Sequence, residues 1–375
     1  MTSRIKSSTT ALKHPLGHPT FWLVSVLVGV VAGLGAVIFR GLIGGFHNLF
    51  FLGKLSFFFD TNLHTPASPW GAWIILAPVV GALGVAFLVK TFAPEARGHG
   101  VPEVMDAVYY HKGIIRPIVA AIKSLASALS IGSGGSVGRE GPIVQIGSSF
   151  GSSLGQLLRL PAWQRITLVA AGAGGGIAAT FNTPIGGILF ATELLLPEIS
   201  ARTLIPVAMS TATATYIGRW LLGINPSFVI PGFQLYKFHL TSLYLVFACP
   251  VLGCLLGVVA TVFTKSIYWF EDFFDRRISK NYYVRHVLGM LLVGIIIYVT
   301  QTAFGHYYVE GVGYATVQQV LTGALSALPL LLLLFVLKVI VTSLTLGSGG
   351  SGGIFSPSLF LGATFGAAFG LVLKT

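Results

Sequence analysis

Long apolar stretches separated by short polar turns make up most of this chain. The apolar residues run continuously instead of alternating with polar ones, and several stretches reach the roughly 20 residues that a helix needs to cross a bilayer. Only helices and closed barrels can span lipid, and continuous apolar runs favour helices. We therefore expect spans at about 21–45, 69–92, 203–223, 240–270, 287–303, 328–345 and 355–373.

The remaining apolar segments are shorter or are interrupted by glycine. The first kind, too short to span, comprises 102–111, 184–197 and 313–324, and the second kind comprises 114–130, 139–158 and 163–181. Lipid tolerates irregular backbone at depth only where protein buries it or where it lines a cavity. The pattern predicts an all-α membrane protein that contains tilted and broken transmembrane helices.

The composition agrees with lipid as the main solvent of this chain. Of the 375 residues, 54% are hydrophobic and 9% are charged, with a mean hydropathy of +0.83, whereas a soluble domain has about 25% charged residues. The apolar run from Phe21 is too long for the core of a signal peptide. Cys249 and Cys254 have neither metal-site nor disulfide spacing, so we expect them to be packing residues.

The formal net charge of +12 raises nucleic acid as a partner, but the basic residues gather in loops. The segment 1–20 holds Arg4, Lys6 and Lys13, and the loop 274–286 holds Arg276, Arg277, Lys280 and Arg285; such clusters mark the cytoplasmic side of a membrane protein. We therefore expect no nucleic-acid partner. The pattern predicts a multi-pass protein of the cell (inner) membrane, in contact with the lipid bilayer, with a cytoplasmic N-terminus.

A Gly- and Ser-rich segment occurs twice in the chain. Residues 131–151 read IGSGGSVGREGPIVQIGSSFG, and residues 346–366, at an offset of 215, read LGSGGSGGIFSPSLFLGATFG. With the match extended back to Lys123 and Lys338, 12 of 29 positions are identical, and the same offset places His99 on Tyr314. We divide the chain into a cytoplasmic segment (1–20), a first transmembrane repeat (21–223) and a second repeat (224–375) that is incomplete at its end.

Duplicated, glycine-interrupted segments indicate a transport site between two repeats. A helix that begins at membrane depth leaves about four N–H groups without partners and carries roughly half a positive charge. An anion can satisfy these groups, and glycine allows the backbone to approach it. The turns at residues 98–102, 138–142 and 353–357 could thus surround one dehydrated anion, with chloride as bound substrate and no cofactor.

Glu140 is an acid at the start of one of these helices. Its carboxylate could occupy the anion site itself and leave on protonation, so we expect a gate that responds to pH; intramembrane acids are commonly functional. The simpler alternative is that Glu140 pairs with Arg139.

The glycine turns have three alternative interpretations: dinucleotide binding, packing by small residues and an intramembrane enzyme. Gly347, Gly349 and Gly352 match a dinucleotide fingerprint but follow an apolar helix instead of a strand. Packing by small residues explains glycine in helices but not two turns that each precede a proline. An intramembrane enzyme would draw on Ser133, Ser136 and His99, which lack a third member, so we expect no catalytic residues, no enzyme activity and no metal.

These residues resemble the signature motifs of the CLC family of chloride channels and chloride/proton antiporters. The motifs stand here as Gly98 to Pro102 (GHGVP), Gly138 to Pro142 (GREGP) and Gly353 to Pro357 (GIFSP). The resemblance implies a CLC-type inverted-repeat bundle that forms a homodimer with one pore per subunit. It further implies Glu140 as the gate and an anion held mostly by backbone amides, at the positions Gly138, Arg139, Glu140, Gly141, Ile354, Phe355, His99 and Gly100.

The chain departs from the family pattern in three ways. His99 replaces the pore serine, which bears on the choice of anion. Leu194 follows Glu193 at the interface and proton-path position, where many antiporters carry a second acid, so channel-like chloride conduction is slightly favoured over chloride/proton antiport. The family also continues with further helices and a chloride-contacting tyrosine, which Tyr314 cannot be, because it precedes the third motif. An inactive or structural truncated homologue is the alternative from another class.

Overall fold

The computed structural model describes residues 15–224, 227–228, 230, 243–278 and 280–373. Most of the predicted cytoplasmic segment at 1–20 therefore lies outside the described residues, as does part of the boundary between the two predicted repeats. Within the described residues the chain consists of helices and turns, and its strand-type pairings are two isolated bridges. The fold is all-α, as predicted.

The first half of the chain contains eight of the α-helices. They are α1 (His18–His47), α2 (Ala77–Phe92), α3 (Val101–Tyr109), α4 (Ile118–Gly132), α5 (Glu140–Leu157), α6 (Ala162–Phe181), α7 (Pro184–Leu194) and α8 (Ala201–Leu222). Short turns of other helical types complete it at η1 (Asn48–Leu52), η2 (Gly71–Leu76) and η3 (Pro94–Ala96).

The described part of the second half contains α9 (Leu243–Phe273), η4 (Phe274–Ile278), α10 (Tyr282–Phe304), α11 (Tyr314–Leu321), α12 (Leu328–Gly347) and α13 (Phe355–Val372). Six helical stretches among the described residues are long and apolar enough to cross a membrane. They are His18–Leu52, Gly71–Phe92, Val246–Ile278, Tyr282–Phe304, Leu328–Gly347 and Phe355–Val372, which agree with six of the seven predicted spans. The seventh, at 203–223, forms α8 but is not among them.

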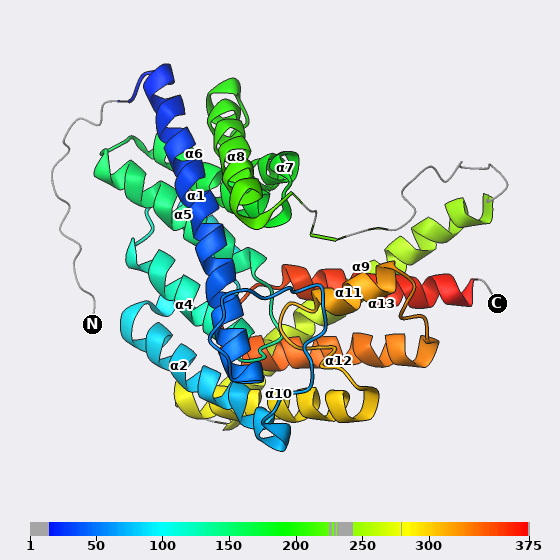
Figure 1. Cartoon of the computed structure of the whole chain (residues 1–375). Helices are drawn as coiled ribbons and strands as arrows, with labels where there is room; N and C mark the ends of the chain where they lie inside the picture. Colours follow the sequence, from blue (N-terminus) through cyan, green and yellow to red (C-terminus); the bar gives the residue numbers. More distant parts are fainter. Residues whose placement is uncertain (1–14, 225–226, 229, 231–242, 279, 374–375) are drawn as a thin grey trace.

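Close helix packing in the first half depends on small residues. A Cβ atom on Gly147 of α5 would collide with the carbonyl oxygen of Gly172 in α6, and one on Gly172 would collide with that of Gly147. A Cβ atom on Gly29 of α1 would likewise collide with the carbonyl oxygen of Ser210 in α8. Figure 1 shows α1, α5, α6 and α8 as one group, with α10, α12 and α13 in a second group.

The sequence repeat is visible in the contacts of two buried lysines. Lys123 of α4 donates from Nζ to the carbonyl oxygens of Ala96 (3.0 Å) and Gly98 (2.8 Å). Lys338 of α12, its counterpart at the offset of 215, donates to those of Val309 (3.1 Å) and Gly311 (3.0 Å). Both side chains are fully buried. Each lysine ties the turn before a short helix to the helix that leads into a glycine turn.

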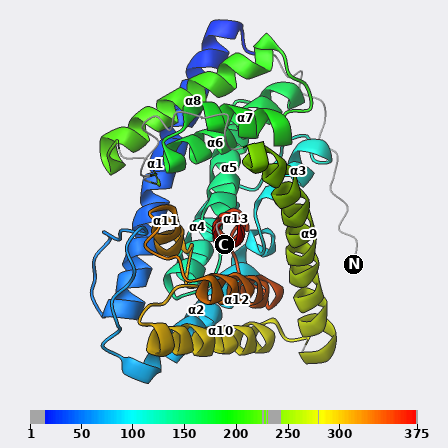
Figure 2. The ribbon, with the colours of Figure 1, turned by 90° about the vertical axis from the view of Figure 1, so that its right-hand side faces the viewer.

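The prediction that the two cysteines are packing residues is wrong. Cys249 and Cys254 are exposed thiols on α9. In the most apolar 18-residue stretch of this helical segment, 6% of the residues are buried. Figure 2 shows α9 at one side of the bundle. An apolar stretch indicates contact with lipid or with protein, and the sequence pattern alone does not separate the two.

Candidate functional site

The two repeated glycine turns lie against each other. Gly138 donates its N–H to the carbonyl oxygen of Gly353 (2.6 Å), and Gly353 donates to that of Gly138 (2.7 Å). The turn before α3 joins them, since Gly98 donates to Gly350 (3.2 Å) and accepts from Gly352 (3.1 Å). Three segments from opposite parts of the chain thus meet at one place, as predicted from their motifs.

Glycine is required where these turns touch. Gly141, the second residue of α5, lies against the carbonyl oxygen of His99, and any Cβ there would collide with it. Gly100 has a φ of +95° and would place a Cβ 2.6 Å from the carbonyl oxygen of Gly141. The starts of α3 and α5 can approach this closely only without side chains.

All three helix starts have N–H groups without a backbone partner. Among the described residues, the N–H groups of Glu140 and Gly141 in α5, of Phe355 and Ser356 in α13, and of Val101 in α3 donate to no backbone carbonyl. At α3 the N–H of the preceding residue, Gly100, donates to the Glu103 carboxylate at 2.8 Å. The predicted anion-attracting ends therefore keep amide groups that no carbonyl oxygen satisfies.

The Glu140 carboxylate lies beside the start of α13. The Ser356 hydroxyl is 2.7 Å from its Oε1 atom and 2.6 Å from its Oε2 atom, so it donates to one of them at a time. The Tyr314 hydroxyl, from the start of α11, also donates to Oε1. Only 2% of Glu140 is exposed. A carboxylate held in this way takes the position that an anion would occupy at the N-terminal end of α13.

Arg139 makes no ion pair with Glu140 within the described part of the chain. Its guanidinium lies over the ring of Tyr314, 5.0 Å from the centroid. The side chain is buried, and its Nε atom has no hydrogen-bond partner. Tyr314 therefore contacts both residues: its ring face lies against Arg139, and its hydroxyl donates to Glu140. The simpler alternative, an ion pair between Glu140 and Arg139, is not found among the described residues.

Arg139 and Glu140 line different cavities. A mainly apolar cavity of about 710 Å³ is lined by Glu140 together with five other predicted site positions: His99, Gly141, Leu194, Ile354 and Phe355. A second cavity, of about 200 Å³, is lined by Arg139 and by residues of the segment 53–70. We call the side of the molecule with this segment the loop face.

His99 has no hydrogen-bond partner for its buried Nε2 atom. It lies in the turn between η3 and α3, outside the membrane-spanning helices. Burial, followed by the charge of Lys123, lowers its pKa, and the charge of Glu271 opposes them. The imidazole is therefore neutral at pH 7 and can offer an N–H to an anion without adding a charge.

The interface and proton-path positions, Glu193 and Leu194, lie in the last helical turn of α7, outside the three glycine-rich segments. Leu194 lines the cavity of about 710 Å³. Glu193 is exposed, and no ion pair of it is found among the described residues.

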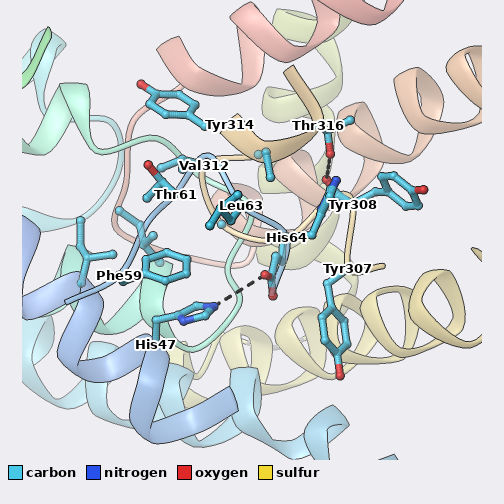
Figure 3. A pocket seen from close by; sticks show the side chains of 16 residues that line it. His47, Phe59, Thr61, Leu63, His64, Tyr307, Tyr308, Val312, Tyr314 and Thr316 are labelled. Atoms are coloured by element: carbon cyan, nitrogen blue, oxygen red, sulfur yellow. Dashed lines mark hydrogen bonds and ion pairs between the residues drawn. The ribbon is translucent and has the colours of Figure 1, made fainter. Parts of the chain in front are cut away.

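Tyr314 and Ser356 were not predicted as site residues. Ser356 is part of the GIFSP motif, so its position was available from the sequence. Tyr314 aligns with His99 at the offset of 215, and this correspondence was the signal for it. Tyr314 also borders a small cavity of about 30 Å³ on the loop face, and Figure 3 shows it across that cavity from His47 and Tyr307.

Comparisons with known proteins agree with these motifs. The family model described as "Voltage gated chloride channel" matches residues 80–375. The H(+)/Cl(−) exchange transporter ClcA of Vibrio parahaemolyticus is 34% identical over 313 residues, which cover 80% of this chain and 63% of the relative. ClcA of Vibrio cholerae is 32% identical and is covered to 72%. The chloride channel protein CLC-f of Arabidopsis thaliana is 30% identical and is covered to 44%.

Solved structures share the arrangement of the helices. A slow cyanobacterial Cl−/H+ antiporter superposes with a TM-score of 0.78 at 24% identity, covering 94% of this chain and 79% of that one. A CLC-type fluoride/proton antiporter superposes with a TM-score of 0.74 at 22% identity, covering 94% and 82%. At these identities the likeness concerns the fold alone. The chain spans less than two thirds of the length of the V. parahaemolyticus relative.

Proposed function

Because this chain belongs to the voltage-gated chloride channel (CLC) family, we propose that it carries chloride across a membrane in exchange for protons. Its Vibrio relatives are named as exchange transporters. Their names favour exchange over the channel-like conduction that Leu194 led us to expect. The Arabidopsis relative is named as a channel protein, so conduction stays the second candidate, with the leucine at position 194 as its supporting observation.

The observation that carries the proposal is the position of the Glu140 carboxylate. It lies at the start of α13, where amide groups and the helix dipole attract an anion, and it lines the cavity of about 710 Å³. While it is ionised and in place, chloride is excluded from that point. Protonation removes its charge and weakens its hold on the donors, and the released amides can then bind chloride.

The exchange follows from this competition. A proton on Glu140 and a chloride at the amides near Ile354 and Phe355 are bound together. When the proton leaves toward one side of the membrane, the returning carboxylate expels the chloride toward the other side, so the two ions move in opposite directions. The amides at Arg139 and Gly141 form the adjacent part of the path. Since Leu194 cannot relay a proton, we propose that water in the cavity of about 710 Å³ carries it to Glu140.

Chloride is the bound substrate, and no cofactor or enzymatic step is needed. The basic segment 1–20 supports a cytoplasmic N-terminus in the cell membrane, which places the loop face outside. The neutral imidazole of His99 tunes the choice of anion. A homodimer with one pore per chain is proposed from the family resemblance.

Flux measurements in liposomes test the proposal. The protein is reconstituted, a chloride gradient is imposed, and protons and chloride are followed in parallel. We expect the chloride gradient to drive protons against their own gradient, and a protonophore to abolish that uphill movement. Chloride flux without proton movement would support conduction, and the absence of both fluxes would support an inactive homologue.

A further inference from the structure

Tyr282, the first residue of α10, contacts two of the three glycine-rich segments. Its hydroxyl donates to the carbonyl oxygen of Gly349 at 2.6 Å, in the turn that leads to α13. The guanidinium carbon of Arg97, the residue directly before the GHGVP motif, lies over its ring, 5.8 Å from the ring centroid. One side chain thus joins the segments that carry His99 and Ile354, which line the same cavity of about 710 Å³.

The helix α10 holds the turn before α13 with a second side chain as well. One helical turn after Tyr282, His286 stacks on its ring, with centroids 6.1 Å apart and an angle of 3° between the ring planes. The Nδ1 atom of His286 lies 3.0 Å from the Ser348 hydroxyl. That hydroxyl donates its proton to the Thr345 carbonyl oxygen at 3.2 Å, so Nδ1 is the donor to Ser348. Two consecutive residues of the turn, Ser348 and Gly349, therefore accept hydrogen bonds from α10.

The ring of Tyr282 is fixed independently of its hydroxyl. Arg97, which lies over the ring, forms an ion pair with Glu271 of α9 at 2.9 Å. A second guanidinium, that of Arg285, lies 5.3 Å from the ring centroid and pairs with Asp275. Contacts between guanidinium groups and an aromatic face are attractive. Removal of the hydroxyl alone should therefore leave the ring in place.

The corresponding position in the first repeat has different neighbours. Gly134, at the offset of 215 from Gly349, also has a positive φ, +107° against +124°. The three atoms nearest to a Cβ placed on it belong to the apolar side chains of Phe51, Pro78 and Ile297. A turn of this shape can thus form against apolar neighbours, and the hydroxyl of Tyr282 gives the turn before α13 a tie of its own.

We propose that Tyr282 is a positioning residue for the transported anion, because it fixes the segment of His99 relative to the amides of Ile354 and Phe355. The role rests on the proposed function, since it presumes an anion at these amides. Backbone donors hold an ion well only at hydrogen-bond distance and in line with it. Without the bond to Gly349, the start of α13 is free to shift against the GHGVP turn, and the ion is held less tightly.

Chloride binding to the full chain in detergent, measured by isothermal titration calorimetry, tests the positioning role. We expect Tyr282→Phe to raise the chloride dissociation constant by about fivefold, because one hydrogen bond that orders the donors is lost. Tyr283→Phe is the matched control, since the ring of Tyr283 faces Lys90 at 5.2 Å instead, and it should bind chloride as the wild type does. An unchanged dissociation constant in Tyr282→Phe would overturn the proposal.

Arg97→Lys is the second variant, and it decides where Tyr282→Phe does not fold. Lysine keeps the positive charge but lacks the planar guanidinium that lies over the Tyr282 ring. We expect Arg97→Lys to weaken chloride binding in the same direction. Wild-type affinity in this variant, where Tyr282→Phe cannot be measured, would overturn the proposal.

Transport in liposomes distinguishes positioning from a merely structural contribution. Tyr282→Phe should raise the half-saturating chloride concentration by about fivefold with maximal flux close to that of the wild type. A lower maximal flux at unchanged half-saturation would indicate loss of folded protein and would overturn the proposal. Chloride binding that Tyr282→Phe weakens, in a protein that transports nothing, would retain the positioning role and refute the proposed function. Transport by the wild type with equal half-saturation in Tyr282→Phe would do the reverse.

Discussion

The gate residue is stabilised by two hydroxyl groups from other parts of the chain. Tyr314 and Ser356 are 174 and 216 positions away from Glu140 in the sequence, and both donate to its carboxylate. A hydrogen bond to a charged group contributes about 1.5–3 kcal/mol. The position of the carboxylate at α13 therefore depends on these donors as well as on the helix dipole.

Removal of the Ser356 hydroxyl should make the gate easier to open. We expect Ser356→Ala to shift the gate equilibrium toward release by about tenfold or more, because one charged hydrogen bond is lost. Chloride efflux from liposomes at neutral pH should rise accordingly. Ser358→Ala is the matched control, since that hydroxyl donates to the Ile354 carbonyl instead. Unchanged or slower efflux in Ser356→Ala would contradict the role.

Tyr314→Phe should act in the same direction as Ser356→Ala. The ring stays in place beneath Arg139, and only the hydroxyl that donates to Glu140 is lost. Tyr308→Phe is the control, because Tyr308 lines the same small cavity (Figure 3) and no hydrogen bond between Tyr308 and Glu140 is found among the described residues. The ratio of efflux at neutral pH to efflux at acidic pH should increase in Tyr314→Phe and stay constant in Tyr308→Phe.

Glu140→Gln should separate chloride flux from protons. The amide keeps the shape of the side chain but cannot ionise, so it competes poorly with chloride for the amides at α13 and carries no proton. We expect chloride flux to persist, its pH dependence to disappear and uphill proton movement to fall to background. Glu198→Gln, in the exposed segment after α7, is the control. A pH dependence that survives in Glu140→Gln would refute the gating role.

The sequence was informative about some of these residues and silent about others. Glu140 could be identified because a charge at membrane depth is unusual. Arg40 could not, because nothing near it in the chain indicates that it lines a cavity together with Arg139. Contacts between distant segments depend on packing, and a single sequence without a repeat or motif at that position does not specify them.

At the scale of elements, the contact between α5 and α6 provides a test of the packing. Alanine favours helix over glycine by about 0.5–1 kcal/mol, but a Cβ on Gly147 collides with the Gly172 carbonyl. Overpacking costs about 1–3 kcal/mol. We therefore expect Gly147→Ala to lower the thermal unfolding temperature in detergent.

The control for Gly147 lies in the other repeat. Gly362 of α13 is its counterpart at the offset of 215, and a Cβ there meets nothing within 4 Å among the described residues. Gly362→Ala should leave the unfolding temperature unchanged or raise it slightly. Equal losses in both variants would show that the α5–α6 contact is not the cause.

Helix positions were largely predictable, since lipid imposes long apolar runs and the glycine turns interrupt them visibly. The predicted segment 139–158 corresponds to α5, and the short segment 102–111 corresponds to α3 with proline in its first turn. What could not be predicted is which face of each helix meets protein. The exposed cysteines of α9 illustrate this, because lipid and a protein core select the same apolar residues.

At the scale of the whole molecule, the two repeats meet at their glycine turns. The pair of hydrogen bonds between Gly138 and Gly353 joins the two halves at the site itself. Movement of one half against the other would therefore alter the anion site directly. The internal repeat predicted this meeting point, whereas the two hydroxyl groups that contact Glu140 required the three-dimensional arrangement.

The burial of the Glu140 carboxylate has an electrical consequence. A charged group held away from both faces of a membrane protein lies within the potential difference between them. Moving one elementary charge through 100 mV changes its energy by about 2.3 kcal/mol. A swing of this carboxylate toward either face carries its charge through part of the field, so we expect the turnover of the protein to depend on voltage.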